Sequence, residues 1–193
     1  MSATPRREAT TARRDQIIRA AVGLLAERGY QATTFDAICR RAGLSSKRLI
    51  TYHFSGKEEL YAAIAGQVVA EAEEFTRPAL DEAEGARATL SAFIRANVRF
   101  MADHLAQMRA LQQLIVNGGE AWAQPHAEAL DRLTGLFAEG SRTGEFRPCD
   151  PRVTATALRA ALDGMYEPLA AGAEPDACAG ELAELFDRAV RPD

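Results

Sequence analysis

The chain has 193 residues, of which 47% are hydrophobic and 26% charged, a composition that is ordinary for a globular protein and excludes wholesale disorder. No apolar run approaches the ~18 residues needed to span a bilayer, and the polar, basic start lacks the apolar segment of a secretory signal, so we expect a cytoplasmic protein. The net charge of −4 is unevenly spread, with eleven Lys or Arg against four acidic residues through residue 57, and twelve against 23 beyond it. A basic head on an acidic body indicates that only the head meets a polyanion.

The pattern along the chain is helical nearly throughout, because no apolar run alternates with the two-residue period of a strand between hairpin turns. A first helix is predicted over residues 13–28, with its apolar side chains on one stripe and Gly29 at its end. Four arginines at the start of the chain resemble a flexible basic arm, for which minor-groove or phosphate contact and simple disorder remain alternatives: Arg6, Arg7, Arg13 and Arg14.

A second, short helix is predicted within the stretch TTFDAICRRAG. Thr33 and Asp36 have the spacing of a capping box at its start, and Gly43 stops it. After the turn that contains Gly43, Ser45 is expected to cap a third short helix.

A fourth helix is predicted to begin at Ser55, with Glu58 in the capping-box position, and Pro78 and Gly85 mark its end and a linker. Proline is tolerated in a first turn, so Pro125 fits the start of a later helix. The further helices are predicted over residues 86–104, 105–116, 124–139, 151–169 and 175–190. Together these elements predict an all-α fold of about nine helices.

Two short helices joined by a turn that contains Gly43, after a longer supporting helix, form a helix-turn-helix pattern. Leu49, Ile50 and Phe54 are expected to anchor the third helix inward. The side chains that would project from this helix and its C-terminal turn are Ser46, Lys47, Arg48, Thr51, Tyr52 and His53. This mixture suits DNA, because cations and hydroxyls contact phosphates while a few side chains reach base edges in the major groove.

Helix starts supply further candidates for phosphate contact. Lys57 lies in the first turn of the fourth helix, where free N–H groups and the positive end of the helix dipole favour an anion. Thr33 or Thr34 is placed in the same way at the second helix, and Ser45 completes the predicted DNA-binding set.

The stretches IIRAAVGLLAERGYQATTFDAICRRAGLS and YHFSGKEEL resemble the N-terminal region of TetR-family transcriptional regulators. The residues that carry the resemblance are Ile17, Ala20, Ala21, Gly29, Tyr30, Thr33, Thr34, Ala42, Gly43, Leu44, Ser45, Tyr52, His53, Phe54, Lys57, Glu58 and Leu60. The resemblance implies a helix-turn-helix DNA-binding domain over residues 1–56, basic arm included. It also implies a helical effector-binding and dimerisation domain over residues 57–193.

One departure from the family pattern concerns the third helix. Ten residues, 44–53, separate Gly43 from Phe54, where the family usually has nine. An extra residue within a helix rotates the later side chains by about 100°. The assignment of Lys47, Arg48 and Thr51 to bases therefore stays open, whereas Tyr52 and Lys57 carry over as phosphate contacts.

The resemblance also implies a ligand cavity and a homodimer interface among the later helices. An apolar, aromatic set with a few polar handles is the candidate effector site, and plain core packing is the alternative for each member: Phe93, Asn97, Phe100, Met101, His104, Met108, Gln112, Trp122 and Phe137. His104 and His126 lack ligand partners at useful spacing, so neither a metal nor a cofactor is expected. Small residues over 151–169 favour close helix contact in a dimer, namely Ala157, Ala161 and Gly164.

The sequence therefore predicts a homodimeric regulator that binds double-stranded DNA at a palindromic operator and is released when a small molecule binds the body. An activator and a non-specific DNA-binding protein of the same fold remain alternatives. An all-helical enzyme is less favoured, because three scattered histidines supply no acid–base or metal constellation. Cys39, Cys149 and Cys178 are expected to be reduced thiols, with a redox switch at Cys39 as the alternative.

Overall fold

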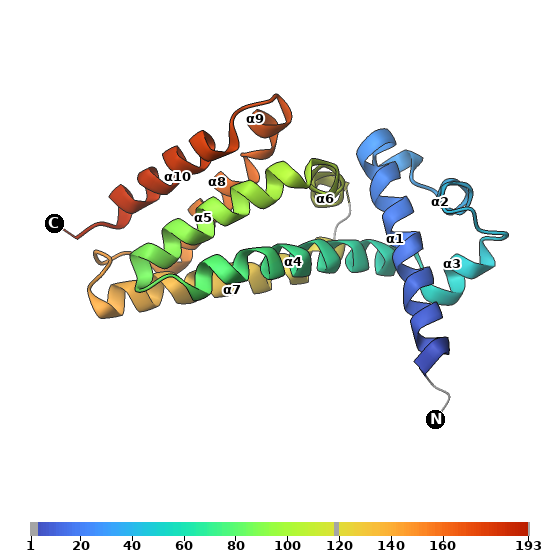
Figure 1. The fold of residues 1–193 in the computed structure, drawn as a ribbon, viewed down its shortest axis with the longest axis horizontal. Coiled ribbons are helices and arrows are strands. Elements are labelled where there is room, and N and C mark those ends of the chain that lie inside the picture. Colours follow the sequence, from blue (N-terminus) through green and yellow to red (C-terminus); the bar gives the residue numbers. More distant parts are fainter. Residues whose placement is uncertain (1–3, 118–119, 193) are drawn as a thin grey trace. The chain divides into compact units, whose positions relative to one another are not determined.

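The computed structural model describes residues 4–117 and 120–192, and the side chains of residues 9–117 and 123–192. Within those residues all regular structure is helical, which confirms the all-α prediction (Figure 1). The count of about nine also agrees, since one of the ten labelled segments, α9, is only five residues long. None of the described helices is long and apolar enough to cross a membrane.

The chain folds into two compact units. The first unit comprises Met1–Val68 and Ala106–Ala123, and the second comprises Val69–Leu105 and Gln124–Asp193. The fourth helix, α4 (Lys57–Asp81), contributes its first part to the first unit and its remainder to the second.

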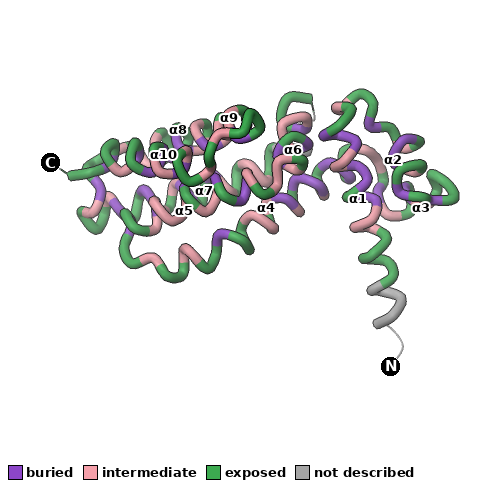
Figure 2. The backbone as a smooth tube through the Cα atoms, turned by 45° about the horizontal axis from the view of Figure 1, so that its top comes forward, coloured by how far each residue is buried: buried purple, intermediate pink, exposed green. Residues whose placement is uncertain are grey.

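The first unit contains α1 (Thr4–Ala32), α2 (Phe35–Arg41), α3 (Arg48–His53) and α6 (Leu105–Asn117) in addition to the start of α4. In Figure 1, α2 and α3 lie on the same side of α1. Its core is one cluster of buried apolar side chains, and α1 changes from exposed near its start to buried along its middle (Figure 2). Two members of this core, Ala110 and Leu114, come from α6 and are both 0% exposed.

The first helix is longer than predicted. It begins at Thr4, so the segment with the four arginines is helical where we expected a flexible arm. The reason is local: Pro5 falls in the first turn, where proline is tolerated, and no Gly or Pro follows before Gly23. Gly29 interrupts the helix as predicted, with φ 77° and ψ 178°, but a further turn continues to Ala32.

The cap of α2 differs from the prediction by one residue. Thr34 is the N-cap, in an extended conformation, and its hydroxyl accepts a hydrogen bond from the Ala37 N–H at 3.2 Å. Thr33 points inward and is 0% exposed. The capping-box spacing from Thr33 to Asp36 was therefore misleading.

Two further capping predictions are also wrong. The N-cap of α3 is Lys47, which makes no side-chain cap hydrogen bond, so Ser45 is not the cap. At the start of α4, the Glu59 carboxylate accepts hydrogen bonds from both the N–H and the hydroxyl of Ser55, each at 2.7 Å. These bonds lower the pKa of Glu59 and give it the role that we predicted for Glu58.

The second unit contains α5 (Ala86–Asp103), α7 (Glu120–Thr143) from Gln124 onward, α8 (Pro151–Asp163), α9 (Tyr166–Ala170) and α10 (Pro175–Val190) with the remainder of α4. α5 and α10 pack along each other (Figure 1). The helix predicted over 151–169 is broken at Gly164, and α4 continues through Pro78 to Asp81. α7 begins at Glu120, so Pro125 lies inside it and not in its first turn.

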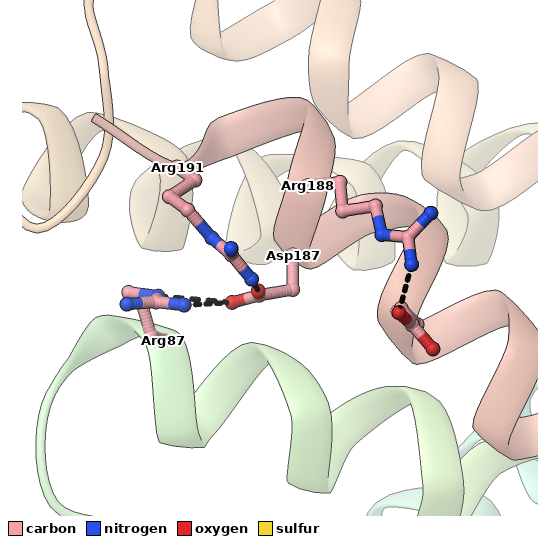
Figure 3. A network of polar contacts seen from close by, with 5 residues as sticks. Arg87, Asp187, Arg188 and Arg191 are labelled. Atoms are coloured by element: carbon pink, nitrogen blue, oxygen red, sulfur yellow. Dashed lines mark hydrogen bonds and ion pairs between the residues drawn. The ribbon is translucent and has the colours of Figure 1, made fainter. Parts of the chain in front are cut away.

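Charged side chains tie the start of α5 to the end of α10. Arg87 donates to the Asp187 carboxylate at 2.9 and 2.6 Å, and Arg191 donates to its other oxygen at 2.6 Å (Figure 3). The two guanidinium groups, Arg191 first, hold the pKa of Asp187 below its usual value. The Arg188–Glu184 pair lies one turn away on the same helix.

Residues 145–147 tie the same ends together by other means. The Glu145 carboxylate accepts from the Arg87 N–H at 3.2 Å, and the backbone N–H groups that start α5 lower its pKa. Arg147 Nε donates to the Ala189 carbonyl at 2.6 Å, and the Arg147 N–H donates to Val190 O at 2.8 Å. Between them Phe146 is 2% exposed. The connection before α8 therefore holds the start of α5 and the end of α10 together.

Candidate nucleic-acid interface

The turn between α2 and α3 is fixed to the core of the first unit. Gly43 has φ 62°, a conformation that favours glycine, and the next residue, Leu44, is 9% exposed. The Cys39 thiol donates to Leu44 O at 3.2 Å. Gln16 on α1 donates to Ala42 O at 2.6 Å. These contacts hold the helix-turn-helix in one arrangement, and no sequence pattern indicated them.

The structure exposes most of the side chains that we predicted to contact DNA. Those that are exposed are Thr34, Ser45, Ser46, Lys47, Arg48, Thr51 and Tyr52, while His53 and Lys57 are half-buried. They come from the start of α2, the turn, α3 and the start of α4. Thr33 is the exception, because its buried hydroxyl donates to Gly29 O at 2.8 Å and cannot reach a phosphate.

Of the ten residues between Gly43 and Phe54, the first four, 44–47, precede α3. α3 begins only at Arg48, and the N–H groups of Leu49 and Ile50 donate to Ser46 O and Lys47 O at 3.2 and 2.9 Å. Ile50 and Phe54 are both 0% exposed, as helical spacing requires. The side chains of α3 therefore keep a regular helical register relative to the core.

The Tyr-His-Phe triplet divides its side chains between solvent and core. Tyr52 is 78% exposed, and its ring meets that of His53 edge-on with centroids 5.1 Å apart. Phe54 is completely buried, and the Arg14 guanidinium carbon lies 4.8 Å from its ring centroid. The triplet therefore joins the exposed Tyr52 ring and the half-buried His53 ring to the anchor of α3.

α4 begins at Lys57, two residues after the predicted start at Ser55, and Lys57 therefore lies in the first turn as predicted, together with the free N–H groups of that turn. Its Nζ lies 5.9 Å from the centroid of the Tyr30 ring. An ammonium group held at a helix N-terminus is suited to a phosphate oxygen.

Two cations of the basic head are engaged within the protein. Arg41 crosses over Gly23, which has no side chain to obstruct it, and forms a two-pronged ion pair with Glu27 at 2.6 Å. Lys47 pairs with Asp36 at 3.1 Å. Both acidic partners are already counted against the cations of the head, so its net positive charge is unchanged by these pairs.

The candidate effector residues fall into both units. Phe100, Met101 and Phe137 are buried and Phe93, Asn97 and His104 half-buried in the second unit, whereas Met108 and Gln112 lie on α6 in the first. The side chain of Trp122 lies outside the described residues.

The structure brings two of these residues together with a neighbour from α4. The Phe100 and His104 rings stack with centroids 4.2 Å apart, and Phe75 approaches Phe100 at 5.6 Å. His104 Nδ1 lies 2.8 Å from Phe100 O, and the Asn97 amide donates to Phe93 O at 2.8 Å. Two of the predicted polar side chains, Asn97 and His104, are thus hydrogen-bonded to backbone carbonyls of α5.

The second unit contains a hollow away from these aromatic residues. It has a volume of about 260 Å³ and is lined by Arg99, Ala102, Asp103, Glu174, Pro175 and Asp176, none of which belongs to the predicted effector set. Among the described residues no group of three or more His, Cys, Asp or Glu is placed to hold a metal ion.

The buried core shared by α1, α2, α3, α4 and α6, the fixed turn and the exposed cationic and hydroxyl face of α3 define a helix-turn-helix DNA-binding protein. The family model described as "Bacterial regulatory proteins, tetR family" matches residues 17–64. The model described as "Tetracyclin repressor-like, C-terminal domain" matches residues 83–167. The chain belongs to the TetR family of bacterial transcriptional regulators, and is not an enzyme.

Two curated relatives are regulators by name. The uncharacterized HTH-type transcriptional regulator YhgD of Bacillus subtilis is 26% identical over 151 residues, which are 74% of this chain and 76% of that protein. The HTH-type transcriptional activator FasR of Mycolicibacterium smegmatis is 36% identical over 85 residues, which are 42% of this chain and 38% of that protein.

Two solved structures have the same fold. FadR from Bacillus subtilis, in complex with stearoyl-CoA, has a TM-score of 0.81 at 20% identity, with 92% of this chain and 99% of that chain covered. AibR, in complex with isovaleryl coenzyme A and operator DNA, has a TM-score of 0.70 at 23% identity, with 93% and 98% covered.

Proposed function

We propose that the chain is a ligand-responsive, homodimeric repressor that leaves a palindromic operator when a small molecule binds its later helices. The observation that carries the proposal is the division of the Tyr-His-Phe triplet, with Phe54 buried and Tyr52 exposed at the end of α3. A recognition helix needs such an anchor, because its outward side chains are useful only when the helix cannot move. As a cytoplasmic regulator the chain would meet its operator directly.

Each part of the exposed face has a proposed role. Lys47, Arg48 and Thr51 face the major groove from α3 and its start, and the regular register of the helix supports base contact by at least one of them. Thr34, Ser45, Ser46, Tyr52, His53 and Lys57 contact the phosphate backbone and set the position of α3.

The proposed division of labour assigns DNA binding to residues 1–56, and effector binding and dimerisation to residues 57–193. α6 does not follow this division, because it lies within residues 57–193 but contributes Ala110 and Leu114 to the core of the first unit.

A dimer contact is proposed through the outer faces of α8 and α10. Leu158 and Leu162 are 0% exposed, so they pack within their own chain and are not free to meet a partner. Val153 on α8 and Leu185 on α10 are 66% and 60% exposed, and Ala157 and Gly164 are exposed along the Val153 stripe. Small and apolar exposed residues permit close contact with a second copy.

The first prediction concerns the operator. Selection of bound duplexes from a random pool with the purified chain should yield a palindrome whose half-sites are about one DNA turn (~34 Å) apart, or a multiple of it, because a two-fold dimer presents two identical helices. A matched selection with the Lys57→Ala, Arg48→Ala double variant should yield no enriched sequence. Enrichment of a single, non-repeated half-site would contradict the dimer, and no enrichment by the wild type would favour the non-specific alternative.

The proposed effector is an acyl-CoA thioester. The support is that FadR and AibR, two proteins with this fold, are described in complex with stearoyl-CoA and isovaleryl coenzyme A. The apolar side chains Phe93, Phe100 and Met101 offer the surroundings that an acyl chain needs.

The second prediction tests this class with five compounds, the two thioesters, coenzyme A and the two free acids. Stearoyl-CoA or isovaleryl-CoA should weaken operator binding at least ten-fold in a fluorescence anisotropy titration, which requires binding about ten-fold tighter to the DNA-free state. Coenzyme A alone and the free acids are the controls and should have no effect. Release by a free acid alone would reassign the effector to the carboxylates, and an operator affinity unchanged by all five compounds would contradict the acyl-CoA proposal.

A transcriptional activator is the second candidate, and the name of FasR favours it. DNA binding is the same for both candidates, so the difference lies in the position of the operator relative to the promoter. Mapping the selected palindrome upstream of a promoter, with lower transcription after deletion of the regulator, would establish activation.

A further inference from the structure

The interruption of α1 leaves backbone donors in need of acceptors. Because Gly29 has φ 77° and ψ 178°, the helical hydrogen-bond pattern is broken there and a new short turn starts at Tyr30. The first N–H groups of any helical turn have no partner within that turn. A side-chain oxygen from elsewhere must accept them, or water must.

Gln113 on α6 supplies that oxygen. Its Oε1 accepts a hydrogen bond from the Tyr30 N–H at 3.3 Å, and a Cβ atom on Gly29 would lie only 3.2 Å from the same oxygen. Gly29 is therefore favoured for its backbone conformation, and the absence of a side chain also leaves room for the close approach of the amide. Ala110 and Leu114, both 0% exposed in the shared core, flank Gln113 on α6 and fix its position.

Tyr30 is also in contact with the proposed phosphate site. Its ring centroid lies 5.9 Å from Lys57 Nζ and 5.1 Å from the ring of Tyr61, which follows Lys57 on α4 by one turn. Burial raises the pKa of Tyr61 to about 12, so its hydroxyl stays protonated and donates to Thr33 O at 3.3 Å. Thr33 in turn donates to Gly29 O at 2.8 Å.

We propose that Gln113 is a positioning residue for DNA binding, which holds Tyr30 beneath Lys57 and so fixes the ammonium group at the start of α4. The contacts form a short chain from Gln113 on α6, through the Tyr30 backbone and ring, to Lys57. Gln113 itself touches no DNA and acts through Lys57. This inference rests on the proposed function, because it assigns to Lys57 a contact with operator phosphate.

The position of Gln113 on α6 gives it a second consequence. Two of the predicted effector contacts, Met108 and Gln112, lie on the same helix. A ligand that displaced α6 would also displace the Gln113 amide from Tyr30. Gln113 thus lies on the helix that carries predicted effector contacts and also takes part in the contacts that position Lys57 for DNA.

The test is a double-mutant cycle on the selected operator. Gln113→Leu removes the acceptor oxygen with little change of volume, and Gln113→Glu is the matched control because it keeps the oxygen. Affinity is measured by fluorescence anisotropy from 50 to 200 mM salt for the wild type, Gln113→Leu, Gln113→Glu, Lys57→Ala and the Gln113→Leu, Lys57→Ala double variant. Thermal unfolding of each variant is recorded alongside.

Gln113→Leu should weaken operator binding about five-fold, the loss expected for one hydrogen bond, and reduce the salt dependence by about one phosphate contact, as Lys57→Ala does. In the Lys57→Ala background it should have no further effect, because the residue through which it acts is absent. Gln113→Glu should keep wild-type affinity.

Additive losses in the double variant, or a lower Tm with unchanged affinity and salt dependence, would overturn the inference and leave Gln113 a structural role. If Gln113→Leu does not fold, Tyr30→Leu replaces it, since loss of the ring beneath Lys57 must give the same non-additivity. Failure of the wild type to bind any duplex would overturn the proposed function as well, whereas binding that depends on Lys57 but not on Gln113 overturns only the inference.

Discussion

Replacing Phe54 with alanine is expected to lower the free energy of unfolding by about 3–5 kcal/mol, the range for a fully buried aromatic side chain. Phe54 is 0% exposed in the core that α1, α2, α3, α4 and α6 share, and it follows the last residue of α3. Removal of the ring leaves a cavity and frees the end of α3. Urea unfolding followed by circular dichroism measures the loss, and operator affinity should fall with it.

Tyr52→Ala is the matched control, two residues away in the same triplet. Tyr52 is 78% exposed, so its loss should change stability by no more than about 0.5 kcal/mol. Operator affinity should nevertheless fall, since the proposed phosphate contact is removed. A stable Phe54→Ala variant that binds operator normally would show that α3 does not depend on this anchor.

A similar loss, about 3–5 kcal/mol, is expected for Phe146→Ala in the second unit. The Phe146 ring is 2% exposed, lies 5.7 Å from the Phe137 ring and packs against Gly140, where a Cβ atom would overlap it. Glu145 and Arg147, on either side of Phe146, contact the start of α5 and the end of α10. The loss of the ring should therefore loosen the connection before α8 together with the ends of both helices. Hydrogen exchange at the amides of α10 would report the loosening.

The complementary change, Gly140→Ala, tests whether glycine is needed at this position because the Phe146 ring packs against it. In the wild type the added methyl group should cost about 1–3 kcal/mol through overpacking. In the Phe146→Ala background the same methyl group enters the space that the ring has left, so the two costs should sum to more than the measured total. Simple additivity would show that the ring does not limit the space at Gly140. Arg142→Ala, which removes only an exposed ion pair with Glu139, is the control and should change stability by no more than about 0.5 kcal/mol.

Helical periodicity located most elements of this fold from the sequence. The helix predicted over 175–190 is the observed α10, and that predicted over 105–116 differs from α6 by one residue. The ends were harder. Thr33 and Thr34 are chemically alike, and which of them caps α2 depends on the burial of Thr33 beneath Gly29 and Tyr61. Burial of that kind is set by residues far apart in the sequence.

The exposed residues of the candidate site could be predicted from the sequence, but the contacts between residues far apart in the chain could not. The exposed cations and hydroxyls of α3 follow from helical spacing around Ile50 and Phe54. The pairing of Arg41 with Glu27 does not, because it depends on the space above Gly23. Nor does the acceptance of the Tyr30 N–H by Gln113, which joins residues 83 positions apart.

The place of α6 in the first unit limits how this regulator can be recombined. A hybrid that joins residues 1–56 to the later helices of a relative would receive a foreign α6, with other side chains where Ala110, Gln113 and Leu114 now meet the head. Grafting the head together with the inward face of α6 keeps that core intact. In such hybrids the part that can be exchanged to change DNA specificity is therefore defined by core packing, and it comprises two separate stretches of the chain.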